Sequence, residues 1–163
     1  MAISINGYIT YGNDNSSWVS EIDWKEFITL KRDSGFIVMG SHTYYQFADD
    51  FPQEEALNVV MTHDPSLLIN SIENVLFTDK TPGEVVQMAK DKGCNQIMLI
   101  GGMSLNTSFL KENLINEIWL DVHPLLIGKG KTVFDQVDLL KKITLLETKE
   151  LGGGQFLTKY KIE

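Results

Sequence analysis

The chain has 163 residues, of which 43% are hydrophobic, and it carries a formal net charge of −8 with a pI near 4.8. This length suits a single domain over residues 1–163, and the acidic balance disfavours nucleic acid or an anionic membrane as the main partner, because the electrostatic contribution would be repulsive. Cys94 is the only cysteine, and the first residues contain neither a basic leader nor a long apolar run. We therefore expect a cytoplasmic protein without disulfides or thiolate metal clusters.

The first half of the chain predicts strands that alternate with helices. Period-2 and short apolar runs indicate the strands, and apolar spacing indicates the helices. In chain order we expect a strand over residues 3–9, a helix over 20–32, a strand over 36–39, a short helix over 43–47, a strand over 57–61 and a weaker strand over 74–77. Ser20 is a plausible N-cap for the first helix.

The second half contains the helix with the clearest signals, over residues 82–92. Thr81 stands at its N-cap, Pro82 at its first position, Glu84 completes a capping box and Gly93 follows its end. After it we expect a strand over 96–100, a helix over 104–112, a strand over 118–123, and strands over 143–147 and 156–162 that flank a turn at 152–154. This order predicts an α/β fold with a mainly parallel central sheet, helices on both faces and antiparallel strands at the C-terminal end.

Two strand-to-helix turns are candidates for phosphate binding. They are Gly40-Ser41-His42-Thr43 and Gly101-Gly102-Met103-Ser104. Glycines let a backbone approach a ligand closely, and the amides that open a helix attract anions. In open α/β sheets, ligands bind beyond the carboxyl ends of the strands, where both turns lie. A glycine pair after a strand is equally common as a plain tight turn, so the local pattern leaves both explanations open.

Several other motifs are incomplete. Residues 128–132, GKGKT, resemble the end of a P-loop, but Leu125 stands where its first glycine is required and no helix pattern follows. His42, His63 and His123 lack the spacing of metal ligands, so we expect no metal. The chain also lacks the motifs of serine hydrolases and Rossmann dinucleotide sites.

Asp23 and Asp121 are the candidate acids. If the Asp23 carboxyl faces an apolar pocket near Trp18 and Phe27, burial would raise its pKa toward that of a proton donor. An acidic residue three positions after Ser20 also simply favours a helix N-terminus, and the pattern leaves the two explanations even. Asp121 is unusual in mid-strand, although a solvated or lysine-paired strand face would also explain it.

Several segments together resemble the dihydrofolate reductase superfamily, most closely the branch that contains the reductase domain of the riboflavin-biosynthesis RibD proteins. The resemblance lies in residues 4–9, 17–20, 36–40 with Thr43, 100–102, 114–118, and HPLLIGKG at 123–130 followed by Phe134. These segments span nearly the whole chain in the family's order. The resemblance implies a three-layer αβα fold and NADPH-dependent hydride transfer to a pterin or a pyrimidine-type substrate. A homodimer is also implied, since it is common in the RibD-like branch.

The resemblance also implies roles for individual residues. The expected cofactor-binding residues are Ile9, Gly40, Ser41, His42, Thr43, Thr62, Gly101, Gly102, Met103, Ser104 and Leu105. Asp23 matches the catalytic acid, and the expected substrate-binding residues are Ala2, Trp18, Phe27 and Asp121. Asp121 replaces a threonine that bonds to substrate and acid in dihydrofolate reductases.

The departures from the family concern its anion-binding arginines. Residues 54–57 lack the arginine that holds the folate tail, and residues 49–52 lack those that hold the ribose phosphate in RibD domains. Ser41 and Ser104 stand at the turns where arginines usually bind the 2′-phosphate of NADPH. The substrate is therefore open between the two classes, NADH is an alternative cofactor, and a nucleotide-binding protein without efficient catalysis is the alternative function.

Overall fold

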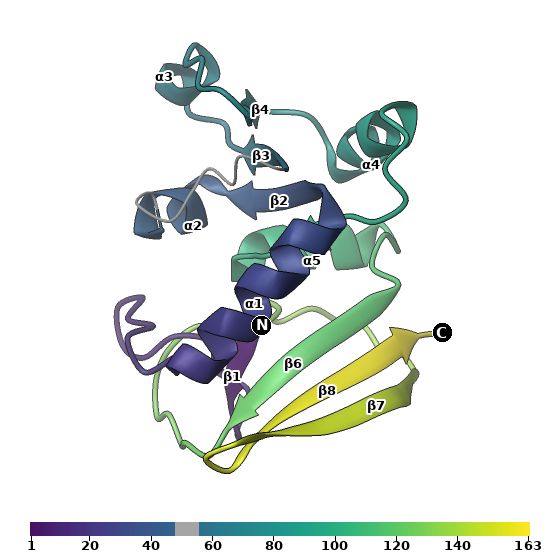
Figure 1. The fold of residues 1–163 in the computed structure, drawn as a ribbon. Coiled ribbons are helices and arrows are strands. Elements are labelled where there is room, and N and C mark those ends of the chain that lie inside the picture. Colours follow the sequence, from purple (N-terminus) through teal and green to yellow (C-terminus); the bar gives the residue numbers. More distant parts are fainter. Residues whose placement is uncertain (48–55) are drawn as a thin grey trace. The chain divides into compact units, whose positions relative to one another are not determined.

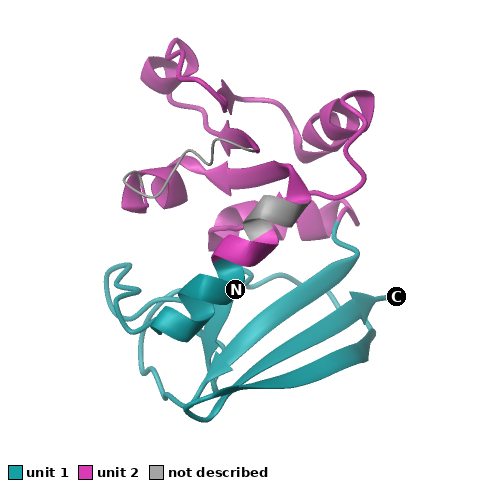
Figure 2. Cartoon of the chain, viewed as in Figure 1, with its two compact units in different colours: residues 1–27, 115–163 teal, residues 28–114 magenta. Residues whose placement is uncertain are grey.

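The chain forms two compact units, which are described separately. The computed structural model describes residues 1–47 and 56–163, without the side chains of 31–33. Unit 1 contains residues 1–27 and 115–163, and unit 2 contains residues 28–114 (Figure 2). The expectation of one domain over residues 1–163 is not tested by this division and stays a prediction.

Unit 1 contains a mixed four-stranded sheet in the order β1-β6-β8-β7. Its strands are β1 (Ala2–Ser4), β6 (Glu117–His123), β7 (Ile143–Gly152) and β8 (Gln155–Ile162). β1 is parallel to β6, whereas β6, β8 and β7 are joined by antiparallel ladders. Helix α1 (Glu21–Ser34) begins in this unit and continues into unit 2.

Unit 2 contains a four-stranded, wholly parallel sheet in the order β4-β3-β2-β5, of which Figure 1 labels β4, β3 and β2. Its strands are β2 (Phe36–Gly40), β3 (Leu57–Met61), β4 (Val75–Thr78) and β5 (Met98–Leu99). Its helices are α2 (Ser41–Gln46), α3 (Pro65–Leu68), α4 (Pro82–Asp91) and α5 (Met103–Lys111). The first four side chains of β2 are completely buried, which explains why this strand is a continuous apolar run in the sequence.

The predicted α/β fold class, with parallel strands and antiparallel strands at the C-terminal end, is confirmed. The predicted order of elements is also correct except for α3, which was not predicted. Asp64 caps this short helix by accepting a hydrogen bond from the Ser66 amide at 2.9 Å, and Pro65 opens it. Because an Asp-Pro pair is typical of both a turn and a helix start, the sequence indicates only the end of the preceding strand here.

The boundaries of three strands differ from the predictions. The first strand ends at Ser4, because the Gly7 amide closes a turn onto the Ser4 carbonyl at 2.9 Å and Gly7 has a φ of +88°. Only Met98 and Leu99 of the strand expected over 96–100 pair with β2. In contrast, β7 continues to Gly152, well past the predicted end.

The helix expected over 82–92 has the predicted capping box. The Thr81 hydroxyl accepts from the Glu84 amide at 3.3 Å, and the Glu84 carboxylate accepts from the Thr81 amide at 2.8 Å. This reciprocal pair fixes where α4 begins.

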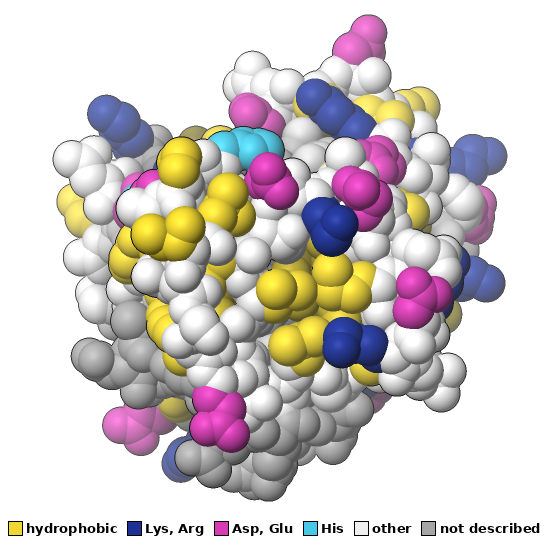
Figure 3. All heavy atoms as spheres, turned by 90° about the horizontal axis from the view of Figure 1, so that it is seen from above, with side chains coloured by type: hydrophobic (Ala, Val, Ile, Leu, Met, Phe, Trp, Pro, Cys, Tyr) yellow, Lys and Arg dark blue, Asp and Glu magenta, His cyan; other side chains and the backbone are white. Residues whose placement is uncertain are grey.

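The length and apolarity of the helices, and the distribution of charge on the surface, bear on which partners the protein can bind. None of the helices in the described ranges is long and apolar enough to cross a membrane. On the face drawn in Figure 3, lysine and acidic side chains are interspersed around apolar patches.

Candidate functional site

The start of helix α1 is fixed by Ser20, as the sequence predicted. The Asp23 amide donates to the Ser20 hydroxyl at 3.1 Å, and the Trp24 amide donates to the Ser20 carbonyl at 3.1 Å. The same hydroxyl donates to Oε1 of the buried Gln155, on β8, at 2.8 Å. The cap therefore ties the first helical turn, which carries Asp23, to the sheet of unit 1.

Strand β6 brings two buried polar side chains to one face of this sheet. Asp121 and His123 are two residues apart, so their side chains point the same way, and each is 2% exposed. The Nδ1 atom of His123 lies 3.6 Å from Oδ1 of Asp121 and 3.2 Å from the Asp121 carbonyl oxygen. Ala2 pairs directly with Asp121 in the register of β1 and β6. The solvated strand face that would also have explained Asp121 is thus wrong.

Asp23 and Asp121 form an interacting pair of carboxyl groups. Burial raises the pKa of Asp23 to about 7, and the neighbouring Asp121 carboxyl raises it further, while the Met1 amino group and His123 act in the opposite direction. Burial also raises the pKa of Asp121, and the contact with Asp23 lowers it. Asp23 is therefore the member of the pair whose protonated form its surroundings favour more.

The Asp121 carboxylate has little other compensation. Neither of its oxygens has a hydrogen bond of conventional geometry within residues 1–47 and 56–163. Its polar surroundings are the Asp23 carboxyl, the Met1 amino group and the His123 ring. A buried carboxylate in this condition depends on such neighbours, because a buried charge is costly unless it is paired or hydrogen-bonded.

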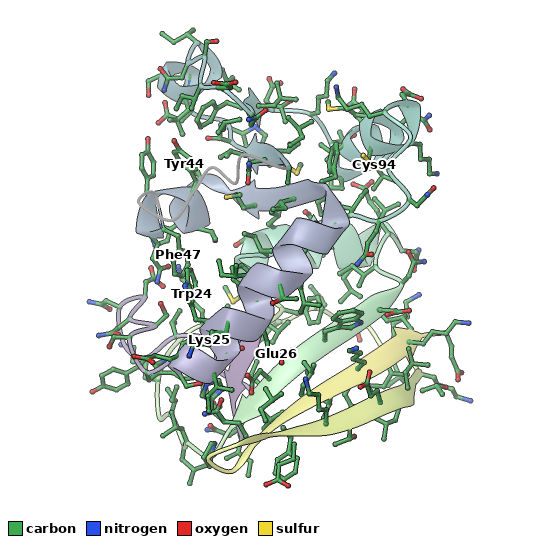
Figure 4. The ribbon with its side chains drawn as sticks, viewed as in Figure 1. Trp24, Lys25, Glu26, Tyr44, Phe47 and Cys94 are labelled. Atoms are coloured by element: carbon green, nitrogen blue, oxygen red, sulfur yellow. The ribbon has the colours of Figure 1, made fainter. Side chains whose placement is uncertain are left out.

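Two aromatic contacts lie near these acids. The Trp18 ring meets His123 edge to face, with centroids 5.1 Å apart. Phe27 contacts Trp24 instead, at 5.5 Å. Trp24 and its neighbours on α1 are labelled in Figure 4. The structure places Ala2, Trp18, Asp23, Phe27 and Asp121 in unit 1, and their roles toward a substrate stay predictions.

In unit 2, the two glycine turns meet at the carboxyl edge of the parallel sheet. The Gly40 amide donates to the Gly101 carbonyl at 2.8 Å, and the Ile100 amide donates to the Val38 carbonyl at 2.9 Å. A Cβ atom added at Gly40 would lie 3.8 Å from the Gly101 oxygen and 3.9 Å from the Gly102 nitrogen. The two backbones therefore run close together where β2 and β5 end.

Both helices that follow these turns begin without a side-chain cap. Gly40 is the N-cap of α2 and Gly102 is the N-cap of α5, and neither can supply a capping oxygen. Uncapped amides at a strand-to-helix turn suit a bound phosphate. The peptide bond between Gly101 and Gly102 is cis.

Thr62 lies at the same edge, one residue after β3. Its amide donates to the Thr78 carbonyl at 2.8 Å, and its hydroxyl accepts from the Asp64 amide at 3.1 Å. Because Gly40 and Met61 are partners in the register, Thr62 follows next to the first glycine turn. Unit 2 thus gathers all predicted cofactor residues except one: Gly40, Ser41, His42, Thr43, Thr62, Gly101, Gly102, Met103, Ser104 and Leu105. Ile9 lies in unit 1, and all these roles stay predictions.

Two further residues of unit 1 contact the predicted site residues, although the sequence did not predict a role for them: His123 and Gln155. The sequence indicates no metal-binding role for His123, which is otherwise named only within the HPLLIGKG segment, and it does not single out Gln155. The alternation of Asp121 and His123 along β6 was the available signal for the histidine. The segments 49–52 and 54–55, which lack the family's arginines, lie outside the described residues.

Comparison with protein families gives one match over nearly the whole length. A family model described as the RibD C-terminal domain matches residues 1–157. Two Bacillus subtilis (strain 168) proteins are also similar. The uncharacterized protein YyaP is 24% identical, with 94% of this chain and 88% of YyaP covered, and the uncharacterized protein YwjB is 25% identical, with 93% and 90% covered.

Solved structures share the fold at lower identity. A Shewanella sp. PV-4 protein, provisionally named a riboflavin biosynthesis protein, has a TM-score of 0.80 at 21% identity, covering 100% of this chain and 96% of its own. A pyrimidine reductase-like protein of Corynebacterium diphtheriae has a TM-score of 0.77 at 16% identity, with 99% and 89% covered. A deaminase/5-amino-6-(5-phosphoribosylamino)uracil reductase of Thermotoga maritima reaches 0.78 at 14% identity, and the match covers 99% of this chain and 54% of that enzyme.

Proposed function

We infer the function of this protein from its family, since the chain belongs to the RibD C-terminal domain family. We propose that it is an NADPH-dependent reductase that transfers hydride to a pterin or pyrimidine-type heterocycle, and that it works in the cytoplasm. The observation that carries the proposal is the carboxyl pair of unit 1, in which Asp121 is buried and partial burial raises the pKa of its neighbour Asp23 to about 7. A group with that pKa can both give and regain a proton near neutral pH, as a general acid must.

The carboxyl edge of unit 2 fits the diphosphate of a dinucleotide. Two close backbone turns without side-chain caps offer amides to anionic oxygens, and no Cβ blocks the approach at Gly40 or Gly102. The hydroxyls of Ser41, Thr43 and Ser104 stand on the same turns and can donate further hydrogen bonds. When bound, NADPH supplies the hydride that reduces a C=N or C=O bond of the substrate.

Asp23 has the role of proton donor in this proposal. With hydride supplied by the bound cofactor, the Asp23 carboxyl would give its proton to the nitrogen or oxygen of the substrate's C=N or C=O bond, so that this bond becomes single and the product carries no added charge. Asp23 then regains a proton from water. The Asp121 side chain is buried. We therefore propose that Asp121 keeps the proton on Asp23 and does not contact the substrate directly.

The basic residues of the chain limit the substrate. Arg32, in α1, is the only arginine in the whole sequence. A bidentate arginine contact to a folate carboxylate or to a ribose phosphate is therefore restricted to one residue, whereas lysines bind such groups as point charges. We propose that a heterocycle without an anionic tail is the better substrate.

The same shortage of arginine favours the second candidate function. A protein that keeps the fold and binds a nucleotide without efficient catalysis needs the glycine turns of unit 2 but not an active Asp23. The two functions differ in whether Asp23 matters for turnover while the cofactor still binds.

The test has a binding arm and a turnover arm. A thermal-shift titration with NADPH and with NADH measures cofactor binding, because a ligand that binds only the folded state raises the melting temperature. Loss of NADPH absorbance is then measured with dihydrofolate, with a dihydropterin that lacks the glutamate tail, and with the ribosylaminopyrimidine phosphate of riboflavin synthesis. We expect an NADPH shift and the fastest turnover with the tailless pterin. An NADPH shift without any turnover would favour the binding protein, and no shift with either cofactor would refute the cofactor assignment.

We also propose that the protein is a homodimer. Support comes from β7, the edge strand of the unit 1 sheet, where Ile143, Leu145 and Leu146 are 49%, 54% and 50% exposed. An exposed apolar edge strand is a ready template for pairing with a second copy. Sedimentation equilibrium should give twice the chain mass, and Leu145→Lys should give the monomer mass if β7 forms the interface.

A further inference from the structure

His123 is a buried, titratable side chain of unit 1 to which the proposed reaction gives no task. Its ring is 2% exposed, and it touches three segments of the unit at once: the N-cap of α1, its own strand β6 and the loop that carries Trp18. A buried imidazole with defined partners on both nitrogens has a fixed orientation. The role inferred for His123 rests on the proposed reductase function, since it concerns how the proton donor Asp23 is held.

The Nε2 atom of His123 faces a donor. The backbone amide of Ser20 donates to it at 3.3 Å. Because an amide N–H has no lone pair to accept a proton, Nε2 must be the unprotonated nitrogen in this arrangement. The ring proton of a neutral His123 therefore lies on Nδ1.

The Nδ1–H group then points to Asp121. It lies 3.2 Å from the Asp121 carbonyl oxygen and 3.6 Å from Oδ1 of the Asp121 carboxylate. The shorter contact is to the backbone, and the longer one brings the Nδ1–H dipole beside a carboxylate whose oxygens have no conventional hydrogen bond in the described residues. The positively charged Met1 amino group also acts on this carboxylate. A donor next to Asp121 favours its ionised form and so leaves the shared proton to Asp23.

The Ser20 contact joins this ring to the helix that carries Asp23. Ser20 receives the Asp23 amide on its hydroxyl and gives its own amide to His123. Gln155 holds the same hydroxyl from β8. One ring thus contacts both the cap that orients Asp23 and the carboxylate that interacts with it.

We propose that His123 is a positioning residue of the reaction, with Nε2 fixing the N-cap of α1 through Ser20 and Nδ1–H keeping the negative charge of the carboxyl pair on Asp121. The charged and titratable groups that surround the pair are the Met1 amino group just before β1, Asp23 and Glu26 on α1, and Asp121 and His123 on β6. On β8, the neighbour is the uncharged Gln155. Of these, only His123 contacts both the cap and Asp121.

Two substitutions separate the two nitrogens of the ring. In His123→Gln, the side-chain oxygen can still accept from the Ser20 amide, but the donor to Asp121 is lost. In His123→Asn, the side-chain amide can still donate to Asp121, but the acceptor for Ser20 is lost. The matched pair therefore tests each contact with the other one kept.

The expected results differ in kind. His123→Gln should move the upper pH midpoint of kcat/KM upward by about one pH unit, because the carboxyl pair loses a donor that favours ionisation, and its melting temperature should stay near wild type. His123→Asn should keep the midpoint and lower the melting temperature. A midpoint that stays in His123→Gln, or that moves equally in both variants, would overturn the proposal.

A measurement on the unsubstituted protein tests the proposal even if a variant fails to fold or if no substrate is turned over. Nitrogen-15 NMR of the three histidine rings reports which ring nitrogen carries the proton, and His42→Gln and His63→Gln assign the His123 signals by elimination. We expect a protonated Nδ1 and an unprotonated Nε2. A proton on Nε2 would overturn the role of His123 whatever the turnover assays show, whereas absent turnover with the expected tautomer would count against the reductase function alone.

Discussion

The two units build their candidate sites from different parts of the chain. In unit 1 the site consists of three neighbouring side chains, Asp23, Asp121 and His123, and the two carboxyl groups shift each other's pKa. In unit 2 it consists of backbone, at the turns of Gly40 and Gly101-Gly102, where side chains are small or absent. A site of the first kind is sensitive to pH and to single-atom changes, whereas a site of the second kind is sensitive to added volume.

This difference matches the two tasks of a reductase. A proton donor needs a shifted pKa, which only burial and neighbouring charges can supply. A dinucleotide diphosphate needs close approach of several amides, which glycine permits. We therefore expect the two units to respond to different kinds of substitution.

The largest expected effect concerns the close contact in unit 1 between the segment after Ile9 and the loop that contains Gly130. A Cβ atom at Gly130 would overlap the backbone carbonyl of Thr10, whereas one at Gly128 would meet nothing within 4 Å. Gly130→Ala should therefore destabilise the protein by about 3 kcal/mol, because two backbones must separate. Chemical denaturation measures this loss, with Gly128→Ala as the matched control. Equal stability of the two variants would show that the loops at 10 and 130 are not packed as described.

Asp23 gives the next largest effect, and its sign depends on pH. The folded protein binds the Asp23 proton with a pKa of about 7 instead of the usual 3.8, so stability falls as pH rises between these values and is then constant. Asp23→Asn removes this cost and should melt roughly 5 °C above wild type at about pH 8, with no difference near pH 4.

A carboxyl in unit 2 provides the control for that measurement. Hydrogen bonds from the Ser66 side chain and amide hold the pKa of Asp64 below its usual value. Asp64→Asn should therefore lower the melting temperature at neutral pH, opposite to Asp23→Asn. If Asp23→Asn, like Asp64→Asn, lowered the melting temperature, the assignment of Asp23 as an acid with a raised pKa would be wrong.

The smallest of these effects is expected for the backbone site of unit 2. A methyl group fits at Gly40, since its contacts of 3.8 and 3.9 Å are ordinary, but it stands where a phosphate must approach the two turns. Gly40→Ala should fold normally and bind NADPH about tenfold more weakly by calorimetric titration. Unchanged affinity would place the cofactor elsewhere. Gly128→Ala again serves as the control, because it also adds a methyl group but places it where no atom lies within 4 Å.

The order of elements could be predicted from the sequence because each signal was local. The capping box at Thr81 and Glu84 and the apolar run of β2 depend on nearby residues, and both were found as expected. Strand ends were predicted less well, because Met98 and Leu99 pair with β2 through tertiary contacts that periodicity does not contain. The short helix α3 was missed for the related reason that an Asp-Pro start is ambiguous.

The candidate site of unit 1 also has a part that could be predicted from the sequence and a part that could not. Asp23 could be singled out because a helix start and an aromatic neighbourhood are visible in the sequence. Its environment could not, since Asp121 lies 98 positions along the chain and Ser20 meets Gln155 only after β8 has paired with β6. The pairing of the two acids, and the place of His123 between Ser20 and Asp121, are products of the sheet.

The central claim is that Asp23 supplies the proton while cofactor binding does not depend on it. The most direct test measures NADPH affinity and the rate of NADPH oxidation for Asp23→Asn, with Glu21→Gln as an exposed acid of the same helical turn for control. We predict that Asp23→Asn binds NADPH as wild type does but loses at least about 100-fold in turnover, with Glu21→Gln unchanged in both. Turnover of Asp23→Asn at the wild-type rate would contradict the account.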